Sequence, residues 1–171
     1  MKQKNVPPRG GQGGRRTQGR AQDDHIDDTY KVQAKRPEPS YCPQCGAVYQ
    51  NGRWQWLAKP DGAKGELCQA CHRSNDHYPA GIVTLSGDFA LQHKGEITAL
   101  VHHNEATEKR EHPLNRIIDI EDHPDRMVIN TTDIHLPRRI GEALAHAYKG
   151  KLDFHYDEDA YFVRVNWQRD T

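Results

Sequence analysis

Four cysteines are the residues whose type and spacing point most directly to chemistry. They form two CxxC pairs, Cys42 with Cys45 and Cys68 with Cys71, and 22 residues separate the pairs. Two residues between thiolates allow one tight turn to present both sulfurs to the same ion, and two such turns can complete a tetrahedral all-thiolate site for Zn2+. We therefore predict one structural zinc ion, with Gly46 taking the positive φ that often follows the second thiolate.

Two other interpretations of these cysteines stay open. A redox-active CxxC usually occurs singly, at the start of a helix in a βαβ unit, and disulfides are typical of secreted chains. With four thiolates the coordination shell is closed to water, so we expect the ion to hold structure and not to support hydrolysis. His72 and His77 lie close in the sequence and are either spare ligands or ordinary surface histidines.

The sequence offers no catalytic motif. It lacks the P-loop, the dinucleotide-binding glycine pattern, the zinc-protease HExxH and the nucleophile-elbow GxSxG. Glu142 and His146 are spaced i, i+4 in a predicted helix, where they form either half of an acid–base or metal pair or an exposed helix face. We favour the exposed face and predict a protein that is not an enzyme and has no small-molecule substrate.

Composition limits the class of protein. Of the 171 residues 35% are hydrophobic, and the mean hydropathy is −0.99, which is low for a fully globular chain. No apolar run approaches the ~18 residues of a transmembrane helix, and no apolar segment follows the N-terminus as it does in a signal peptide. We expect no membrane partner and a cytoplasmic, reducing location that keeps the thiols available for metal.

A net charge of zero hides an uneven distribution. Residues 1–40 hold nine Lys or Arg and five Asp or Glu, whereas residues 41–171 hold 15 and 19. The acidic part is therefore not a general phosphate binder, and contact with nucleic acid needs a local basic patch or the N-terminal tail.

Residues 1–40 are predicted to be a disordered Arg/Gly-rich tail and linker. The first 20 residues carry six Lys or Arg, five Gly and no acid, so they cannot anchor a fold. Arginine interleaved with glycine is similar to RNA-binding RGG segments, in which guanidinium groups stack on bases and pair with phosphates. The alternative is a solubilising tail without a partner.

Residues 41–79 are predicted to form the four-cysteine zinc-binding module, and residues 80–171 an α+β domain. In the module, residues 53–57 alternate polar and apolar side chains as a short strand does. Trp54 and Trp56 are interpreted as its small core and less readily as platforms for base stacking, because a module of this size has little else to bury.

The α+β domain shows clear periodicity. A first helix is expected over about residues 95–110 with Glu105 and Glu108 outside, and a second up to Gly150 with an apolar stripe that includes Ala147. Strands are expected at residues 82–85, 116–120, 127–130, 152–156 and 161–167. The order β-α-β-β-α-β-β predicts an α+β fold in which a four-cysteine zinc ribbon precedes a split-βαβ, ferredoxin-like α/β sandwich with an extra strand.

The cysteine module and the elements after it resemble a known family. The segments that carry the likeness are residues 41–56 with a CxxC, an aromatic, a Gly turn and a Trp; residues 67–73 with a CxxC followed by His-Arg; and residues 116–122, 126–130 and 138–144. Over roughly residues 41–167 they resemble the large-ribosomal-subunit export adapter family, an Nmd-type group of zinc proteins. The chain looks like a truncated relative, since the family's other paired cysteines and further domains have no counterpart in it.

The resemblance implies a zinc-stabilised protein that binds the large ribosomal subunit or structured RNA without catalysis, with the four cysteines as zinc ligands. The alternative is a protein–protein adapter with a structural zinc site, whose acidic part docks a protein partner. At the ends of the second helix, basic residues either contact phosphates or only solvate the helix. The residues predicted to contact RNA are Arg9, Arg15, Arg16, Arg20, Arg53, Arg73, Arg138 and Arg139.

Overall fold

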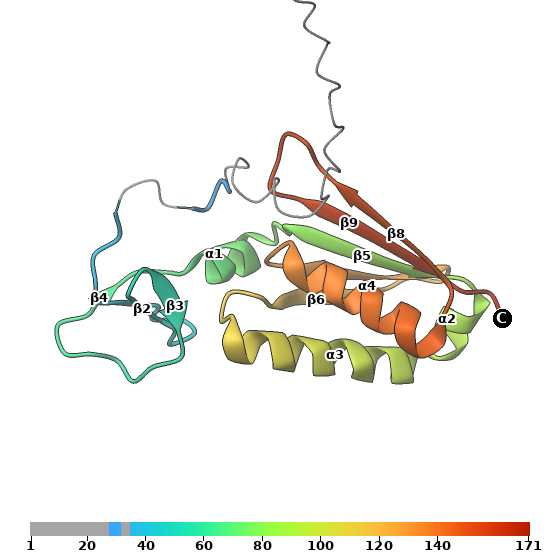
Figure 1. Cartoon of the computed structure of the whole chain (residues 1–171), viewed down its shortest axis with the longest axis horizontal. Helices are drawn as coiled ribbons and strands as arrows, with labels where there is room; N and C mark the ends of the chain where they lie inside the picture. Colours follow the sequence, from blue (N-terminus) through green and yellow to red (C-terminus); the bar gives the residue numbers. More distant parts are fainter. Residues whose placement is uncertain (1–27, 32–34) are drawn as a thin grey trace, which may run out of the picture.

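The computed structural model describes residues 28–31 and 35–171, which form two β-sheets and four α-helices (Figure 1). The predicted α+β class is confirmed. The elements of the smaller unit are β1 (Ser40–Tyr41), β2 (Val48–Gln50), β3 (Arg53–Gln55), β4 (Lys64–Gly65) and α1 (Gln69–Asp76). The elements of the larger unit are β5 (Gly81–Ser86), α2 (Asp88–Gln92), α3 (Lys94–Glu111), β6 (Ile117–Asp122), β7 (Arg126–Thr131), α4 (His135–Tyr148), β8 (Lys151–Tyr156) and β9 (Val163–Gln168). The predictions made for residues 1–27 and 32–34 lie outside the described residues.

The smaller unit is a four-stranded sheet of very short strands in the order β3-β2-β1-β4. Strands β2 and β3 are joined by Asn51 and Gly52, which both have positive φ, as a type I′ hairpin turn requires. The carboxylate of Glu38 accepts hydrogen bonds from the backbone N–H groups of both turn residues, at 3.1 and 2.9 Å. The end of the linker therefore fixes the hairpin that precedes the second cysteine pair.

The sequence analysis missed helix α1. It begins directly after Cys68, whose side chain accepts a hydrogen bond from the N–H of Cys71, and it ends at His77, where φ is 49° and the backbone N–H bonds back to Arg73 and Ser74. A left-handed residue at this place is a common way for a helix to end. The helix carries one of the four cysteines and connects the small sheet to β5.

The larger unit is a five-stranded sheet in the order β6-β7-β5-β9-β8. Strand β5 pairs with β7 antiparallel and with β9 parallel, and β8 pairs with β9 antiparallel at the sheet edge. In a ferredoxin-like sheet the strand that follows the second helix pairs directly with the first strand. Here the extra strand β9 pairs with the first strand, β5, and the strand that follows the second long helix, β8, lies next to β9 at the sheet edge.

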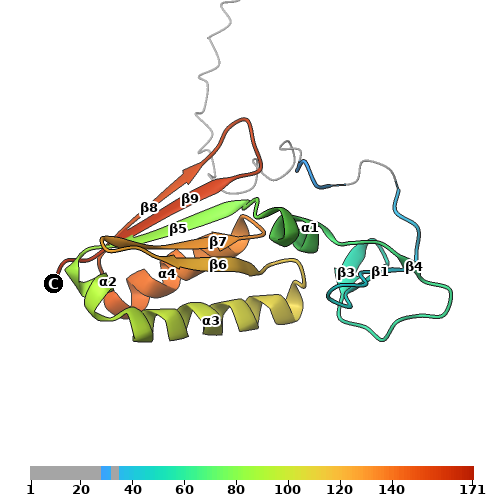
Figure 2. The ribbon, with the colours of Figure 1, turned by 180° about the vertical axis from the view of Figure 1, so that it is seen from behind.

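Both long helices cover the same face of this sheet, as the two opposite views in Figures 1 and 2 show. Residues on that face alternate with exposed ones along β9: Val163, Val165 and Trp167 are buried, and the residues between them are exposed. The strand predicted at residues 161–167 is confirmed as β9, and its alternation is the pattern of a sheet with one buried and one open face. Helix α4 packs on β9 and β5 and contacts α3 along its other side.

The first predicted helix, expected over about residues 95–110, is confirmed as α3, and a short helix α2 precedes it with His93 between them. Two predictions about side chains on the helices are corrected. Glu108, predicted to face outward, is buried because it accepts from the Arg139 guanidinium at 2.8 Å and from the Asn115 amide at 3.3 Å. Ala147 is exposed, because the sheet-facing side of α4 ends one turn earlier.

Contacts cross from one unit to the other. The Trp56 indole N–H donates to the carbonyl of Lys109 at the end of α3, at 2.7 Å, and Leu114 packs against the cysteines. The division at residues 79 and 80 therefore stays a prediction about domains. Among the described residues, no helix combines the length and apolar character needed to cross a membrane.

Candidate metal centre

The four cysteines predicted as metal ligands lie together. Their Sγ atoms are all within 4.8 Å of one another, with 3.7 Å between Cys42 and Cys71 and 3.8 Å between Cys45 and Cys68. Three of the four are fully buried, and Cys45 is half-buried. The cluster joins the turn after β1 to the start of α1.

Backbone geometry aims the sulfurs at a common point. The N–H of Cys68 points at the Sγ of Cys42, and the N–H of Cys71 points at the Sγ of Cys68, each at 3.4 Å. In the first turn the N–H of Gly46 donates to the carbonyl of Cys42 at 2.8 Å, and Gly46 has a φ of 82°. The positive φ predicted for this glycine is confirmed.

The sulfur spacing fits one tetrahedral metal ion. With metal–sulfur bonds of about 2.3 Å, the edge of a ZnS4 tetrahedron is about 3.8 Å, and the two shortest Sγ–Sγ distances are 3.7 and 3.8 Å. A disulfide needs sulfurs about 2.05 Å apart, so the cysteines are free thiols or thiolates in this arrangement. The set of soft donors matches zinc among the common structural metals.

The protonation of the thiols makes metal binding depend on pH. Burial raises the pKa of Cys68 and of Cys71. Burial acts the same way on Cys42, but backbone N–H groups of Cys68, Cys45 and Gln44 oppose it and bring the pKa of Cys42 down to about 7. Without a metal, Cys68 and Cys71 would hold their protons at neutral pH, and a metal that binds must displace them.

Arg116 is the functional residue that the sequence analysis missed. Its guanidinium donates to three sulfurs, those of Cys68 at 3.2 Å, Cys45 at 3.3 Å and Cys71 at 3.4 Å. Burial alone would lower its pKa, but the neighbouring thiolates outweigh burial and raise the pKa of Arg116. Four thiolates and one Zn2+ carry a net charge of −2, so this arginine removes half of the excess charge.

The position of Arg116 is set by the larger unit. Its Nε donates to the carbonyl of Pro113 at 2.7 Å, and its backbone N–H donates to the hydroxyl of Thr132 at 3.0 Å. The N–H of Thr132 in turn donates to the Arg116 carbonyl at 2.9 Å. The guanidinium therefore reaches the cysteines from a backbone fixed at the edge of the five-stranded sheet.

The neighbouring histidines do not join the cluster. His72 and His77 are exposed, and the four cysteines are the only group of His, Cys, Asp and Glu that could hold a metal within residues 28–31 and 35–171. Glu142 pairs with Arg138 at 3.0 Å on the exposed side of α4, and neither Glu142 nor His146 belongs to a group of three or more potential metal ligands. Trp54 packs against the cysteines as predicted, whereas Trp56 is 39% exposed.

The arginines predicted to contact RNA are scattered. Arg53 is exposed in the small sheet, while Arg138 and Arg139 on α4 are exposed but paired with Glu142 and Glu108 at 3.0 and 2.8 Å. Arg9, Arg15, Arg16 and Arg20 lie outside the described residues. Among the predicted RNA-binding arginines that the structure describes, Arg53 is therefore the one that has no ion-pair partner in the described part of the chain.

The prediction that Arg73 contacts RNA is corrected. Only 2% of this residue is exposed, and its guanidinium donates to Asp28 at 2.6 Å and to the carbonyl of Tyr78 at 3.1 Å. It also lies 4.6 Å from the ring centroid of Tyr30, whose hydroxyl donates to Asp76 at 2.8 Å. Arg73 thus holds residues 28–31 against α1 and is not available to a partner.

Comparisons with known proteins give no relatives. No family model matches the sequence, no curated protein is similar to it, and no solved structure matches the fold.

Proposed function

We propose that this protein is a zinc-stabilised, non-catalytic binding protein that associates with RNA, and specifically with the large ribosomal subunit, in the cytoplasm. The observation that carries the zinc part is the spacing of the four sulfurs, because all four coordination positions are taken by protein. A closed shell has no position for substrate or water, so the metal would hold the fold and take no part in a reaction.

The ribosomal part rests on the resemblance of residues 41–167 to the export adapter family. The RNA part is supported by charge that is concentrated locally: Lys31, Lys35 and Arg53 have no carboxylate partner among the described residues, although residues 41–171 as a whole are acidic. Local basic groups on an acidic protein favour a specific contact over general attraction to phosphates.

The test is sedimentation with purified large subunits, small subunits and total RNA, at low and moderate salt. The wild-type chain is compared with a full-length variant in which Arg9, Arg15, Arg16 and Arg20 are replaced by Gln. Co-migration of both proteins with the large subunit alone supports the proposal, because it places specificity outside the tail. If the wild-type chain binds every RNA equally and the variant does not bind, the association is only nonspecific electrostatic attraction.

A protein–protein adapter is the second candidate, favoured by the open face of the five-stranded sheet. The two long helices, α3 and α4, lie on the other face (Figures 1 and 2). On the open face the Asn130 amide donates to Asp119 and Glu121, at 2.6 and 3.1 Å, forming an acidic edge. The adapter would be favoured if the protein binds neither ribosomes nor RNA and a protein partner is recovered whose affinity depends only weakly on salt.

A further inference from the structure

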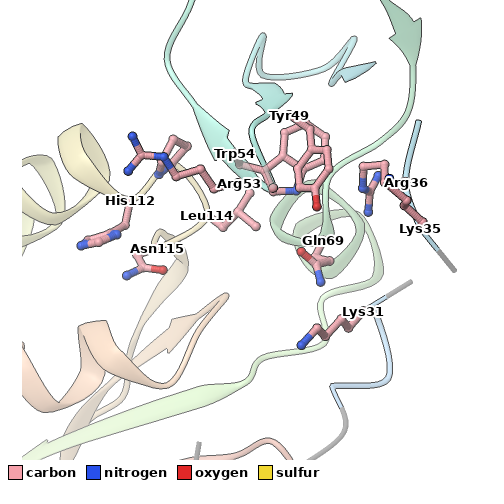
Figure 3. Close-up of a pocket in the computed structure, with 12 residues that line it drawn as sticks. Lys31, Lys35, Arg36, Tyr49, Arg53, Trp54, Gln69, His112, Leu114 and Asn115 are labelled. Atoms are coloured by element: carbon pink, nitrogen blue, oxygen red, sulfur yellow. The ribbon is translucent and has the colours of Figure 1, made fainter. Parts of the chain in front are cut away.

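We infer that the pocket between the small sheet and the end of α3 binds the phosphate and base of an unpaired RNA nucleotide. This inference rests on the proposed association with RNA and gives it a specific site. The pocket has a volume of about 470 Å3, which lies within the ~300–1,000 Å3 of typical small-ligand sites. Its lining comes from Lys31, Lys35 and Arg36, from the β2–β3 hairpin, from the start of α1 and from the segment after α3 (Figure 3).

Positive charge without a counter-charge is the first feature of this pocket. Lys31, Lys35 and Arg53 line it, no described lining residue is Asp or Glu, and none of the three cations has a carboxylate within ion-pair distance in the described part of the chain. In Figure 3, Lys35 and Arg53 lie on opposite sides of the aromatic pair in the middle. Such an arrangement suits the backbone phosphates of a strand that passes over the pocket.

The floor of the pocket is rigid. A fourth cation, Arg36, is already neutralised by Glu66 at 2.5 Å and lies over the rings of Trp54 and Tyr49, 4.9 and 5.4 Å from their centroids. Trp54 also packs against the cysteine cluster. A ligand would therefore meet the fixed edges of the two rings, and Arg36 would stay in its internal pair.

Polar groups that can read a base line the same pocket. The side-chain amide of Gln69 makes no hydrogen bond with a described residue, and the amide nitrogen of Asn115 is used by Glu108 while its oxygen has no described donor. Donors and acceptors of this kind recognise the edge of an unpaired base. A duplex presents its groove as an extended surface that does not fit a concavity of this size, so the ligand is a single-stranded or bulged nucleotide.

The test uses full-length protein in which Arg9, Arg15, Arg16 and Arg20 are replaced by Gln, so that the tail does not dominate the measurement. Binding of an unstructured ten-nucleotide RNA is followed by fluorescence anisotropy between 50 and 300 mM KCl. One variant of this protein adds Lys35→Gln with Arg53→Gln. The matched control adds Lys64→Gln with Lys151→Gln, which removes the same charge from exposed residues that do not line the pocket.

We expect the pocket variant to bind at least tenfold more weakly at the lowest salt. The slope of log affinity against log salt should fall by about 1.4, since each phosphate contact to a single strand contributes about 0.7. The control should change affinity by less than threefold, and both variants should melt at the parent temperature because the altered side chains are exposed.

Equal loss of affinity in the pocket variant and the control would overturn the inference, and so would equally tight binding of a duplex RNA of the same length. If wild-type protein sediments with large subunits while the pocket variant binds the RNA as its parent does, the proposed function stands and the pocket inference fails. If the wild-type chain binds neither subunits nor RNA, both fail.

Discussion

The guanidinium of Arg116 donates to the Sγ of Cys68 across 3.2 Å, although the two residues belong to different units of the fold. Arg116 stands at the edge of the five-stranded sheet, and Cys68 begins helix α1. Through this contact the charge of the thiolate cluster is balanced by a residue that only the folded larger unit can position. Metal binding in one unit is thereby linked to the folding of the other.

Arg116→Gln should weaken metal binding without removing a ligand. Groups that hydrogen-bond metal ligands typically contribute about 10–100-fold in affinity, and this one contacts three sulfurs, so we expect a loss in that range. Competition with a chromophoric zinc chelator measures it. Arg116→Lys should restore part of the affinity, because it keeps the charge but not the fork geometry; Arg126→Gln, at an exposed site, is the control. An affinity equal to wild type would contradict the linkage.

Cys42→Ser should unfold the small unit. Metal coordination supplies folding free energy that strands of two or three residues cannot supply. The wild-type protein should contain one zinc per chain by elemental analysis, and a strong chelator should give the same loss of near-UV signal as the substitution. A metal-free protein with unchanged near-UV signal and melting would show that the thiols are not a structural metal site.

Arg73→Gln should lower stability by about 2–3 kcal/mol, because it leaves the partly buried carboxylate of Asp28 without its charged partner and removes the cation–π contact with Tyr30. Denaturant unfolding measures the loss. The exposed Arg138→Gln, which removes only a surface pair with Glu142, should change stability by less than about 1 kcal/mol. Equal effects of the two substitutions would contradict the structural role given to Arg73.

Two helix glycines should respond in opposite directions to alanine. A Cβ on Gly141 would lie 2.8 Å from side-chain atoms of Leu152 and Val165, so Gly141→Ala should destabilise by about 1–2 kcal/mol. Gly95, in the first turn of α3, has open space around its Cβ position, so Gly95→Ala should stabilise by about 0.5 kcal/mol. Thermal unfolding of the pair tests the close packing of α4 on the sheet; a stabilising Gly141→Ala would contradict it.

Asp133 should make stability depend on pH. Its Oδ2 accepts from the N–H groups of His135 and Leu136 at the start of α4, but its Oδ1 has no described partner, and burial raises its pKa to about 6. The folded state then holds this proton more tightly than the unfolded state. Its contribution to stability is fully present below about pH 4 and is lost as pH rises through 6.

Asp133→Asn keeps a cap acceptor and removes this titration. The unfolding free energy of the variant minus that of wild type should therefore rise by roughly 2 kcal/mol between pH 4.5 and 7. The difference between the two proteins is the relevant quantity, because acid also displaces metal from thiolates in both. A difference that stays constant over this pH range would show that Asp133 is ionised throughout.

Local patterns predicted much of this fold. The two CxxC pairs located the metal centre, Gly46 marked the end of the first turn, and the period of two in residues 161–167 predicted the strand observed as β9. These features depend on residues close together in the sequence, so spacing and periodicity are sufficient to find them.

Features that depend on distant residues could not be predicted in this way. Helix α1 is only eight residues long and has three buried residues, Ala70, Cys71 and Arg73, so it offers no long apolar stripe from which to predict a helix. Arg116 precedes a strand as any surface arginine can, and only the tertiary fold brings it to the cysteines. The sequence shows Arg73 only as a cation just after a CxxC pair, which predicts an exposed side chain. It is buried beside three tyrosine rings that come from separate parts of the chain.

The central position of β9 has a consequence for the order in which the chain becomes folded. Strand β5 pairs with β9 residue by residue, from Gly81 with Val163 to Ser86 with Gln168. Until the ribosome has released residues 163–168, β5 has an unpaired edge, and the face of α4 that packs on β9 has nothing to cover. The five-stranded sheet therefore becomes complete only after β9 has been synthesised, and a nascent chain stalled before Val163 would expose an aggregation-prone edge.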